Sequence, residues 1–205
     1  MFLERELNGS IARNPAGKSK NELRRMLLEA RLHAALDPLH NDALKHRMLA
    51  ILQRYAPRSV GFYWPLAGEF DAREAIAMWL ALDANRLASL PVVKGREEPL
   101  EFHAWTPDAP MQTGLHRIPV PASALVVQPD LLLVPCVGFD EDGYRLGYGG
   151  GYYDRTLAAW HGNARPVTVG VAYEACRTPR LVREAHDIPL DAIITDAGCY
   201  PRPAN

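Results

Sequence analysis

The stretch that decides the fold is Val134-Pro-Cys-Val-Gly-Phe-Asp-Glu-Asp-Gly-Tyr-Arg-Leu-Gly-Tyr-Gly-Gly-Gly-Tyr-Tyr-Asp-Arg155. Its first residues belong to a nearly continuous apolar run, 130–137, which is typical of a strand covered on both faces. A glycine-rich loop then leads into a helix predicted over 152–160. A buried strand joined to a helix in this way is the unit of an α/β fold, whose ligands bind at the carboxyl ends of the strands.

The rest of the chain alternates between predicted helices and strands. Ser19 to Glu22 and Asp71 to Glu74 have capping-box spacing, so a helix is predicted to follow each, and another is predicted over 41–55. Strands are predicted over 59–65, 86–93, 100–105, 166–173 and 192–195. We therefore expect a three-layer α/β sandwich with a mainly parallel sheet. Residues 106–128, rich in proline, are expected to form a long surface connection of the kind that often serves as a lid.

Composition limits the classes of protein to which the chain can belong. With 205 residues, 48% of them hydrophobic, we expect a flexible tail over 1–17 and a single domain over 18–205. The 23 basic and 24 acidic residues give a net charge of −1, which argues against broad binding of nucleic acid or of a membrane surface. Three cysteines without C-x-x-C spacing favour a reducing cytoplasm. The seven histidines have no zinc-site spacing, and we expect a monomer.

The glycine-rich loop has the composition of a phosphate-binding site. Its glycines permit positive φ and close approach of the backbone, so that successive N–H groups can surround an anion that Arg145 clamps. Asp154, which follows, suits either a Mg²⁺ ligand or an acid at the start of a helix. A plain glycine-rich turn is the alternative. The residues concerned are Gly147, Gly149, Gly150 and Gly151.

The same stretch resembles the signature of the 5-formyltetrahydrofolate cyclo-ligases, P-x-x-x-F-D-x-x-G-x-R-L-G-x-G-x-G-Y-Y-D, with every fixed position filled from Pro135 to Asp154. The resemblance implies an ATP-dependent, Mg²⁺-dependent closure of 5-formyltetrahydrofolate to 5,10-methenyltetrahydrofolate, through an N5-iminophosphate and with release of ADP and phosphate. It also implies the fold of sugar-phosphate isomerases and CoA transferases.

The resemblance implies roles for two basic residues near the start of the helix that follows Ser19. Lys20 and Arg24 are similar to a K-x-x-x-R pair that contacts the nucleotide phosphates, although Lys18 is a rival for the position of Lys20. Four residues apart, they share one helix face, which without the family would equally suit a solvated basic face. Lys20 and Arg145 are the expected catalytic cations. The ATP loop is expected to comprise Arg145, Leu146, Gly147, Tyr148, Gly149, Gly150, Gly151, Tyr152 and Tyr153.

Folate contacts are implied for Glu69 and Trp105, with Tyr152 and Tyr153 beside them. A carboxylate such as that of Glu69 can accept two hydrogen bonds from a pterin, and an indole can stack near it. The alternatives are a loop acid for Glu69 and a core residue for Trp105.

The metal is expected between Asp154 and Asp191, although Asp191 equally suits an acid at the start of a strand. One departure from the family stands in Ile118-Pro-Val-Pro121, where Val120 occupies the position of a glutamate in many members. The contacts of that glutamate are therefore in doubt for this chain.

Two other functions remain open from sequence. A sugar-phosphate isomerase or transferase on the same fold would need no ATP, but should show a catalytic carboxylate or lysine that we do not identify. A non-catalytic nucleotide-binding or RNA-associated module is disfavoured by the neutral charge and by the retention of Lys20, Arg145 and Asp154.

Overall fold

The computed structural model describes residue 17 and residues 19–160 and 165–202. Its centre is a seven-stranded sheet in the order β11-β10-β9-β6-β1-β2-β3. The five inner strands run parallel, and an antiparallel strand closes each edge. The strands are β1 (Ser59–Gly61), β2 (Leu87–Val93), β3 (Leu100–Trp105), β6 (Leu131–Pro135), β9 (Val167–Val171), β10 (Ala192–Ile194) and β11 (Cys199–Pro201).

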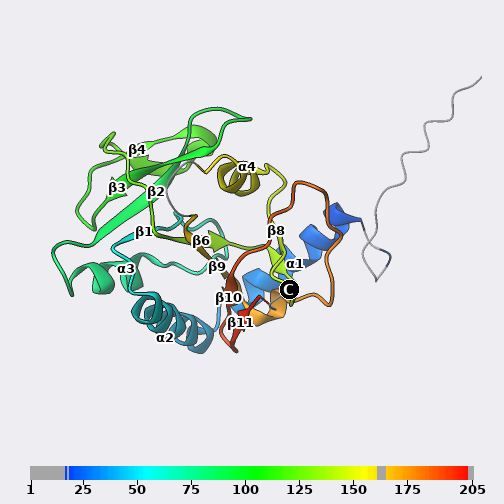
Figure 1. The fold of residues 1–205 in the computed structure, drawn as a ribbon. Coiled ribbons are helices and arrows are strands. Elements are labelled where there is room, and N and C mark those ends of the chain that lie inside the picture. Colours follow the sequence, from blue (N-terminus) through cyan, green and yellow to red (C-terminus); the bar gives the residue numbers. More distant parts are fainter. Residues whose placement is uncertain (1–16, 18, 161–164, 203–205) are drawn as a thin grey trace, which may run out of the picture.

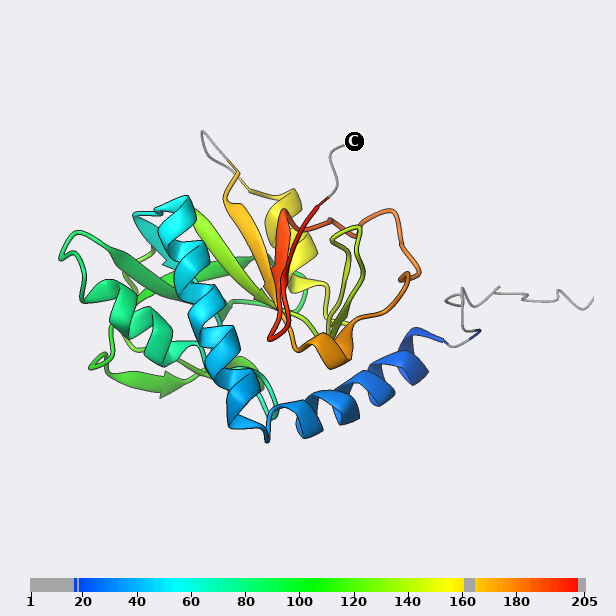
Figure 2. The same cartoon turned by 90° about the horizontal axis from the view of Figure 1, so that it is seen from below.

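Helices cover both faces of this sheet, so the predicted α/β class with a mainly parallel sheet is confirmed. Figure 1 shows α2 (Pro38–Tyr55) and α3 (Arg73–Leu80) below the sheet and α4 (Tyr152–Ala158) above it. Seen from below in Figure 2, α1 (Lys20–Ala34), α2 and α3 lie on the near side. Within the described part of the chain, no helix is long and apolar enough to cross a membrane.

Strand β6 explains why the sheet needs both layers of helices. Its residues 131–134 are fully buried, and their side chains alternate between two clusters. Leu131 and Leu133 pack with the side chains of α2 and α3, whereas Leu132 and Val134 pack with Leu157 of α4. The apolar run is continuous because neither face of the strand meets water.

A side-chain cap marks the start of two of the four α-helices in the described residues, α1 and α2. The capping box of Ser19 and Glu22 is present at α1. Helix α2 begins earlier than predicted, because Asp37 caps it and Pro38 is tolerated in the first turn. The capping box predicted from Asp71 is wrong: Ala72 is the N-cap of α3, and the Asp71 carboxylate instead pairs with the Arg73 side chain.

Residues 106–128 are more ordered than a plain connection. They contain a hairpin of β4 (Met111–Thr113) and β5 (Pro119–Pro121), with a 3₁₀ turn, η1 (Leu115–Arg117), between them. Strands this short, with prolines that cannot donate to a ladder, show no periodicity in the sequence. A second hairpin, β7 (Gly138–Phe139) with β8 (Arg145–Leu146), leads to the glycine-rich loop, and a 3₁₀ turn, η2 (Glu174–Cys176), follows β9.

Candidate active site

A cavity of about 450 Å³ lies at the carboxyl ends of the parallel strands, where ligands bind in folds of this class. Pro135 at the end of β6 and Val93 at the end of β2 form its floor. Five segments surround it: the start of α1, the loop after β1, the tip of the β4–β5 hairpin, the glycine-rich loop, and the loop before β10. Their lining residues include Lys20, Arg24, Tyr63, Trp64, Glu69, His116, Val120, Arg145, Tyr148, Tyr152, Tyr153, Asp154, Glu184 and Asp187.

The glycine-rich loop presents free backbone donors to this cavity. Gly149 and Gly151 have φ of 97° and 65°, a region that residues with a side chain rarely adopt. Among the described residues, no protein acceptor receives the backbone N–H groups of residues 148–151. Arg24 Nε donates to the carbonyl of Gly147 at 2.7 Å, so its guanidinium lies against the loop. The predicted neighbourhood of Arg24 and the glycines is therefore present.

Lys20 lies on the same wall, held by two carboxylates that the sequence analysis did not single out. Its Nζ is 2.8 Å from Glu184 Oε1 and 3.3 Å from Asp187 Oδ2. Burial acts to lower the pKa of Lys20, but the hydrogen bond to Glu184 and the charge of Asp187 outweigh it and raise the pKa. Lys20 thus stays protonated at neutral pH. Its rival Lys18 lies outside the described residues, as do residues 1–16 of the tail predicted over 1–17.

Arg145 and Asp154 form an ion pair at the base of the cavity. Arg145 Nη2 lies 3.0 Å from Asp154 Oδ2, and the two side chains are only 6% and 17% exposed. Arg145 also donates to the carbonyl of Ile188, while Asp154 accepts from the N–H of Ile188. Helix α4 begins at Gly151 without a side-chain cap. The Asp154 carboxylate therefore tethers the loop before β10 to Arg145.

Glu69 lies on another wall of the cavity, almost removed from water. Its side chain is 4% exposed, and its oxygens accept from the N–H of Leu66 at 2.8 Å and from the Tyr148 hydroxyl at 2.9 Å. Arg31 of α1 forms an ion pair with it at 3.3 Å. Arg31 was not predicted as a site residue, because it follows Lys20 by eleven residues and only the fold brings it to Glu69.

Two tyrosines of α4 face the cavity from its glycine-rich side. The Tyr152 hydroxyl lies 3.1 Å from His116 Nε2 at the tip of the hairpin, which joins the hairpin to α4. His116 and Arg117 have φ of 58° and 60°, an unfavourable conformation for residues other than glycine. Burial raises the pKa of Tyr153 well above its usual value, so this hydroxyl stays protonated. Val120 contributes an apolar surface on the hairpin side.

Two predicted site residues lie elsewhere. The Trp105 ring packs edge-on against Phe62, 5.0 Å between centroids, inside the core, so its predicted contact with a ligand is corrected. Asp191 Oδ2 accepts from the N–H and hydroxyl of Thr168 at 2.8 and 2.7 Å. Asp191 precedes β10, at the edge of the sheet opposite the cavity, because β10 is parallel to its neighbour β9.

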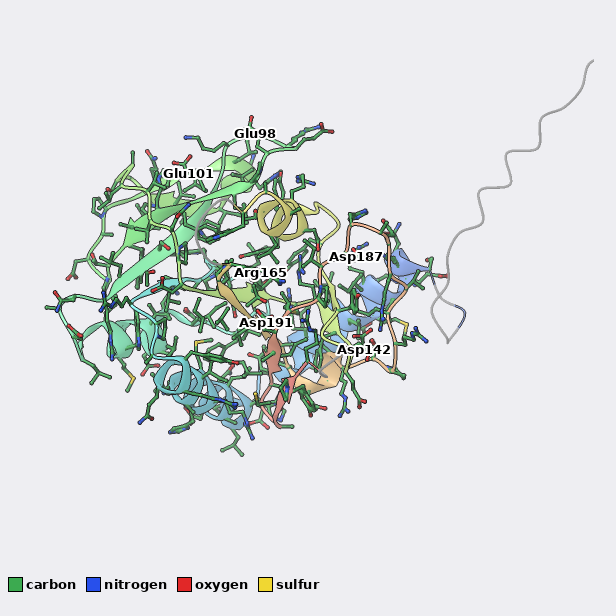
Figure 3. All side chains as sticks on the ribbon, viewed as in Figure 1. Glu98, Glu101, Asp142, Arg165, Asp187 and Asp191 are labelled. Atoms are coloured by element: carbon green, nitrogen blue, oxygen red, sulfur yellow. The ribbon has the colours of Figure 1, made fainter. Side chains whose placement is uncertain are left out.

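Asp187, and not Asp191, is the aspartate that lines the cavity together with Asp154. In Figure 3, Asp187 lies on the loop beside α1, whereas Asp191 lies at β10. Asp154 binds the N–H of Ile188, the residue next to Asp187, which brings the two acids to one wall. Within the described residues, no three His, Cys, Asp or Glu side chains converge to hold a metal ion by themselves.

Known proteins are similar to this chain over most of its length. A sequence model of the 5-formyltetrahydrofolate cyclo-ligase family matches residues 16–196. The 5-formyltetrahydrofolate cyclo-ligase of Haemophilus influenzae is 30% identical over 182 residues, covering 85% of this chain and 94% of the relative. That of Escherichia coli K12 is 32% identical over 174 residues, covering 78% and 92%.

Solved structures are similar over nearly the whole chain. The NMR structure of Aquifex aeolicus 5,10-methenyltetrahydrofolate synthetase superposes with a TM-score of 0.73 at 30% identity, covering 91% of this chain and 94% of that one. The synthetase of Mycoplasma pneumoniae gives a TM-score of 0.68 at 24% identity, covering 87% and 99%, which supports the fold.

The buried cysteines near the cavity are predicted to be unreactive. Burial raises the pKa of Cys136 to about 12 and that of Cys176 to about 11, so neither thiol ionises at neutral pH. A thiol reagent at pH 8 should modify only the exposed Cys199 in the folded protein, and all three cysteines after unfolding. Mass spectrometry of the labelled peptides checks this, and rapid labelling of Cys136 in the folded protein would contradict it.

Proposed function

The chain belongs to the 5-formyltetrahydrofolate cyclo-ligase family, and from this premise we propose that it closes 5-formyltetrahydrofolate to 5,10-methenyltetrahydrofolate with conversion of ATP to ADP and phosphate. One observation carries the proposal. A single cavity joins a glycine-rich loop with free N–H groups and three cations, on one side, to a buried carboxylate among apolar walls, on the other. The first suits phosphates, and the second suits a pterin.

The phosphate side is assigned to the glycine-rich loop with Lys20, Arg24 and Arg145. Free backbone N–H groups bind phosphate oxygens, and positive φ at Gly149 and Gly151 keeps the backbone accessible. The three cations come from two separate elements, α1 and β8, so they can face one anion from different directions. Such an arrangement stabilises charge on a transferring phosphoryl group.

The folate side is assigned to Glu69 and the apolar walls around it. The Glu69 carboxylate matches the donors of a pterin edge, and Trp64, not Trp105, is the indole that lines the cavity. Val93, Leu100, Ile118 and Val120 add apolar surface for the aromatic part of the substrate. Val120 makes this wall more apolar than a glutamate would.

The proposed chemistry removes an oxygen that leaves poorly by itself. The formyl oxygen on N5 attacks the γ-phosphorus and ADP departs, giving an N5-iminophosphate. N10 then attacks the activated carbon, the carbon–oxygen bond breaks, and phosphate leaves with that oxygen while N10 loses its proton to water. The protein's part is to hold the reactants in line and to neutralise charge.

Mg²⁺ fits the carboxylates of this site. The ion usually binds one or two protein carboxylates and completes its shell with water and substrate phosphates, so Asp154 and Asp187 suffice without a third acid. When bound, Mg²⁺ would offset charge on the phosphates. Asp154 pairs with Arg145, and Asp187 pairs with Lys20. With magnesium and phosphate bound, the two acids would face the metal and the two cations would face the phosphate. Each of the four side chains would then still have a partner of opposite charge. The cytoplasmic location and the monomeric state stay predictions.

The direct test follows the methenyl product by its absorbance. Mixing the protein with 5-formyltetrahydrofolate, ATP and Mg²⁺ should produce 5,10-methenyltetrahydrofolate and one ADP for each product molecule. ATP without folate should yield little ADP. Absence of product, or cyclisation at full rate without a nucleotide, would refute the proposed function.

Arg24→Ala should lower kcat/KM for ATP by roughly tenfold to a hundredfold, because it removes a charged contact from the phosphate side. Arg25→Ala is the matched control: its side chain is exposed on the same helix and does not line the cavity. Steady-state kinetics with varied ATP distinguish the two. Equal losses in both variants would show that Arg24 has no specific role.

Asp187→Asn should raise the Mg²⁺ concentration needed for half-maximal activity, because it removes a negative charge from the metal side. Asp191→Asn should leave that concentration unchanged, since Asp191 binds Thr168 away from the cavity. Initial rates at a fixed ATP concentration and varied free Mg²⁺ measure both. A shift in the Asp191 variant alone would return the metal role to that residue.

A further inference from the structure

Arg31 connects the two sides of the cavity. Its side chain is 3% exposed, and one nitrogen, Nη2, donates to the carbonyl of Ala67 at 2.7 Å and to the Tyr148 hydroxyl at 2.6 Å. The other, Nη1, donates to Glu69 Oε1 at 3.3 Å. A guanidinium can hold several acceptors in one fixed plane, as a lysine cannot. Arg31 therefore ties the carboxylate of the folate side to a tyrosine of the phosphate loop.

Tyr148 is the exposed member of this cluster. Tyr148 is 45% exposed, whereas the side chains of Arg31 and Glu69 are buried. Glycines flank it: Gly149 has φ of 97°, and a side chain added at Gly147 would meet no atom within 4 Å. Glycine on both sides gives the backbone beside Tyr148 a wider choice of φ and ψ than other residues would allow, and the contact that holds it is the hydrogen bond from Arg24 Nε to the Gly147 carbonyl. Its ring lies 5.4 Å from the Arg31 guanidinium.

The hydrogen bonds of Glu69 leave too few acceptor positions for a folate. A carboxylate has about four such positions, two on each oxygen. Oε2 accepts from Leu66, while Oε1 accepts from both Arg31 and Tyr148, so a single position on Oε2 remains. A pterin edge that donates two hydrogen bonds needs one more. Of the three present donors, Arg31 is buried and Leu66 donates its backbone N–H, whereas Tyr148 donates the hydroxyl of an exposed side chain that is flanked by glycines.

The Tyr148 hydroxyl keeps its proton and so remains a donor to Glu69. Burial, with the nearby charge of Glu69, raises its pKa to about 12. At neutral pH it therefore occupies Oε1 unless the loop moves.

We propose that Tyr148 couples the two substrates: its hydroxyl occupies the position on Glu69 that folate needs, and nucleotide binding to the glycine-rich loop withdraws it. Arg31 is the positioning residue that keeps Glu69 in place when Tyr148 leaves. The inference rests on the proposed function for the identity of both ligands. The free N–H groups of Tyr148 and of the three residues after it give the phosphates a direct hold on this segment.

The coupling has a definite sign. Withdrawal of Tyr148 opens Oε1, so nucleotide should tighten folate binding, and folate should tighten nucleotide binding by the same factor. Arg31 Nη2 retains the carbonyl of Ala67 as an acceptor after Tyr148 leaves, so this nitrogen does not lose its last partner. Arg31 Nε has no partner among the described residues even before that change. A factor of about five or more corresponds to the usual range of coupling between two sites.

Titration calorimetry tests the coupling with 5-formyltetrahydrofolate, Mg²⁺ and the β,γ-imido analogue of ATP, which does not transfer its terminal phosphoryl group. In the unaltered protein, saturating analogue should lower the Kd for folate about fivefold or more. Tyr148→Phe keeps the ring over Arg31 but lacks the hydroxyl. The analogue should therefore change the Kd of this variant for folate by less than about twofold. Tyr144→Phe is the matched control, because Tyr144 packs against Arg183 and does not line the cavity.

The outcomes separate the inference from the function on which it rests. A folate Kd that ignores the analogue in the unaltered protein, or full coupling retained in Tyr148→Phe, overturns the inference. Loss of coupling in Tyr144→Phe as well also overturns it, because the effect is then not specific to Tyr148. Circular dichroism confirms that each variant is folded. Failure of the unaltered protein to form the methenyl product refutes the proposed function instead, whatever the binding data show.

Discussion

Pairing of buried charges is the constraint on which the site depends. Arg31 and Arg145 are 3% and 6% exposed, and each is compatible with burial because a carboxylate lies against it. A buried charge left without its partner costs on the order of 3–5 kcal/mol, so neither side chain of a pair can be replaced freely. The first pair joins α1 to the loop after β1, and the second joins β8 to α4. The walls of the cavity are therefore held together by their own charges.

The parts predicted correctly from sequence are those with a local cause. The apolar run of β6, the capping box at Ser19 and the glycine-rich loop each depend on neighbouring residues, and each is present where expected. The predictions for Trp105 and Asp191 are wrong because the sheet decides both positions. Pairing in the sheet turns the Trp105 side chain into the core, and the direction of β10 puts Asp191 at the amino end of that strand. Arg31 and Asp187 were missed since their partners are distant in sequence.

The same distinction explains how the site is built. Parallel strands place their carboxyl ends at one edge, and each connecting loop adds a short piece of wall there. No single piece has a ligand's complete set of partners: the glycine-rich loop has donors but few charges, while α1 supplies Lys20, Arg24 and Arg31. The chain carries almost no net charge, yet its cavity has separated positive and negative groups. The charge of the site therefore comes from the local arrangement of ionised side chains and not from the net charge of the chain.

The position of β10 between β9 and β11 matters for synthesis on the ribosome. Residues 184–188, which hold Lys20 and Arg145, precede β10, and Arg47 of α2 donates to the carbonyls of Asp196 and Ala197 beyond it. Helices α1 and α2 thus complete their contacts only with segments far along the chain, and long-range parallel pairing is slow to form. A nascent chain in which residues 184–188 have not yet reached α1 and β8 has no finished cavity.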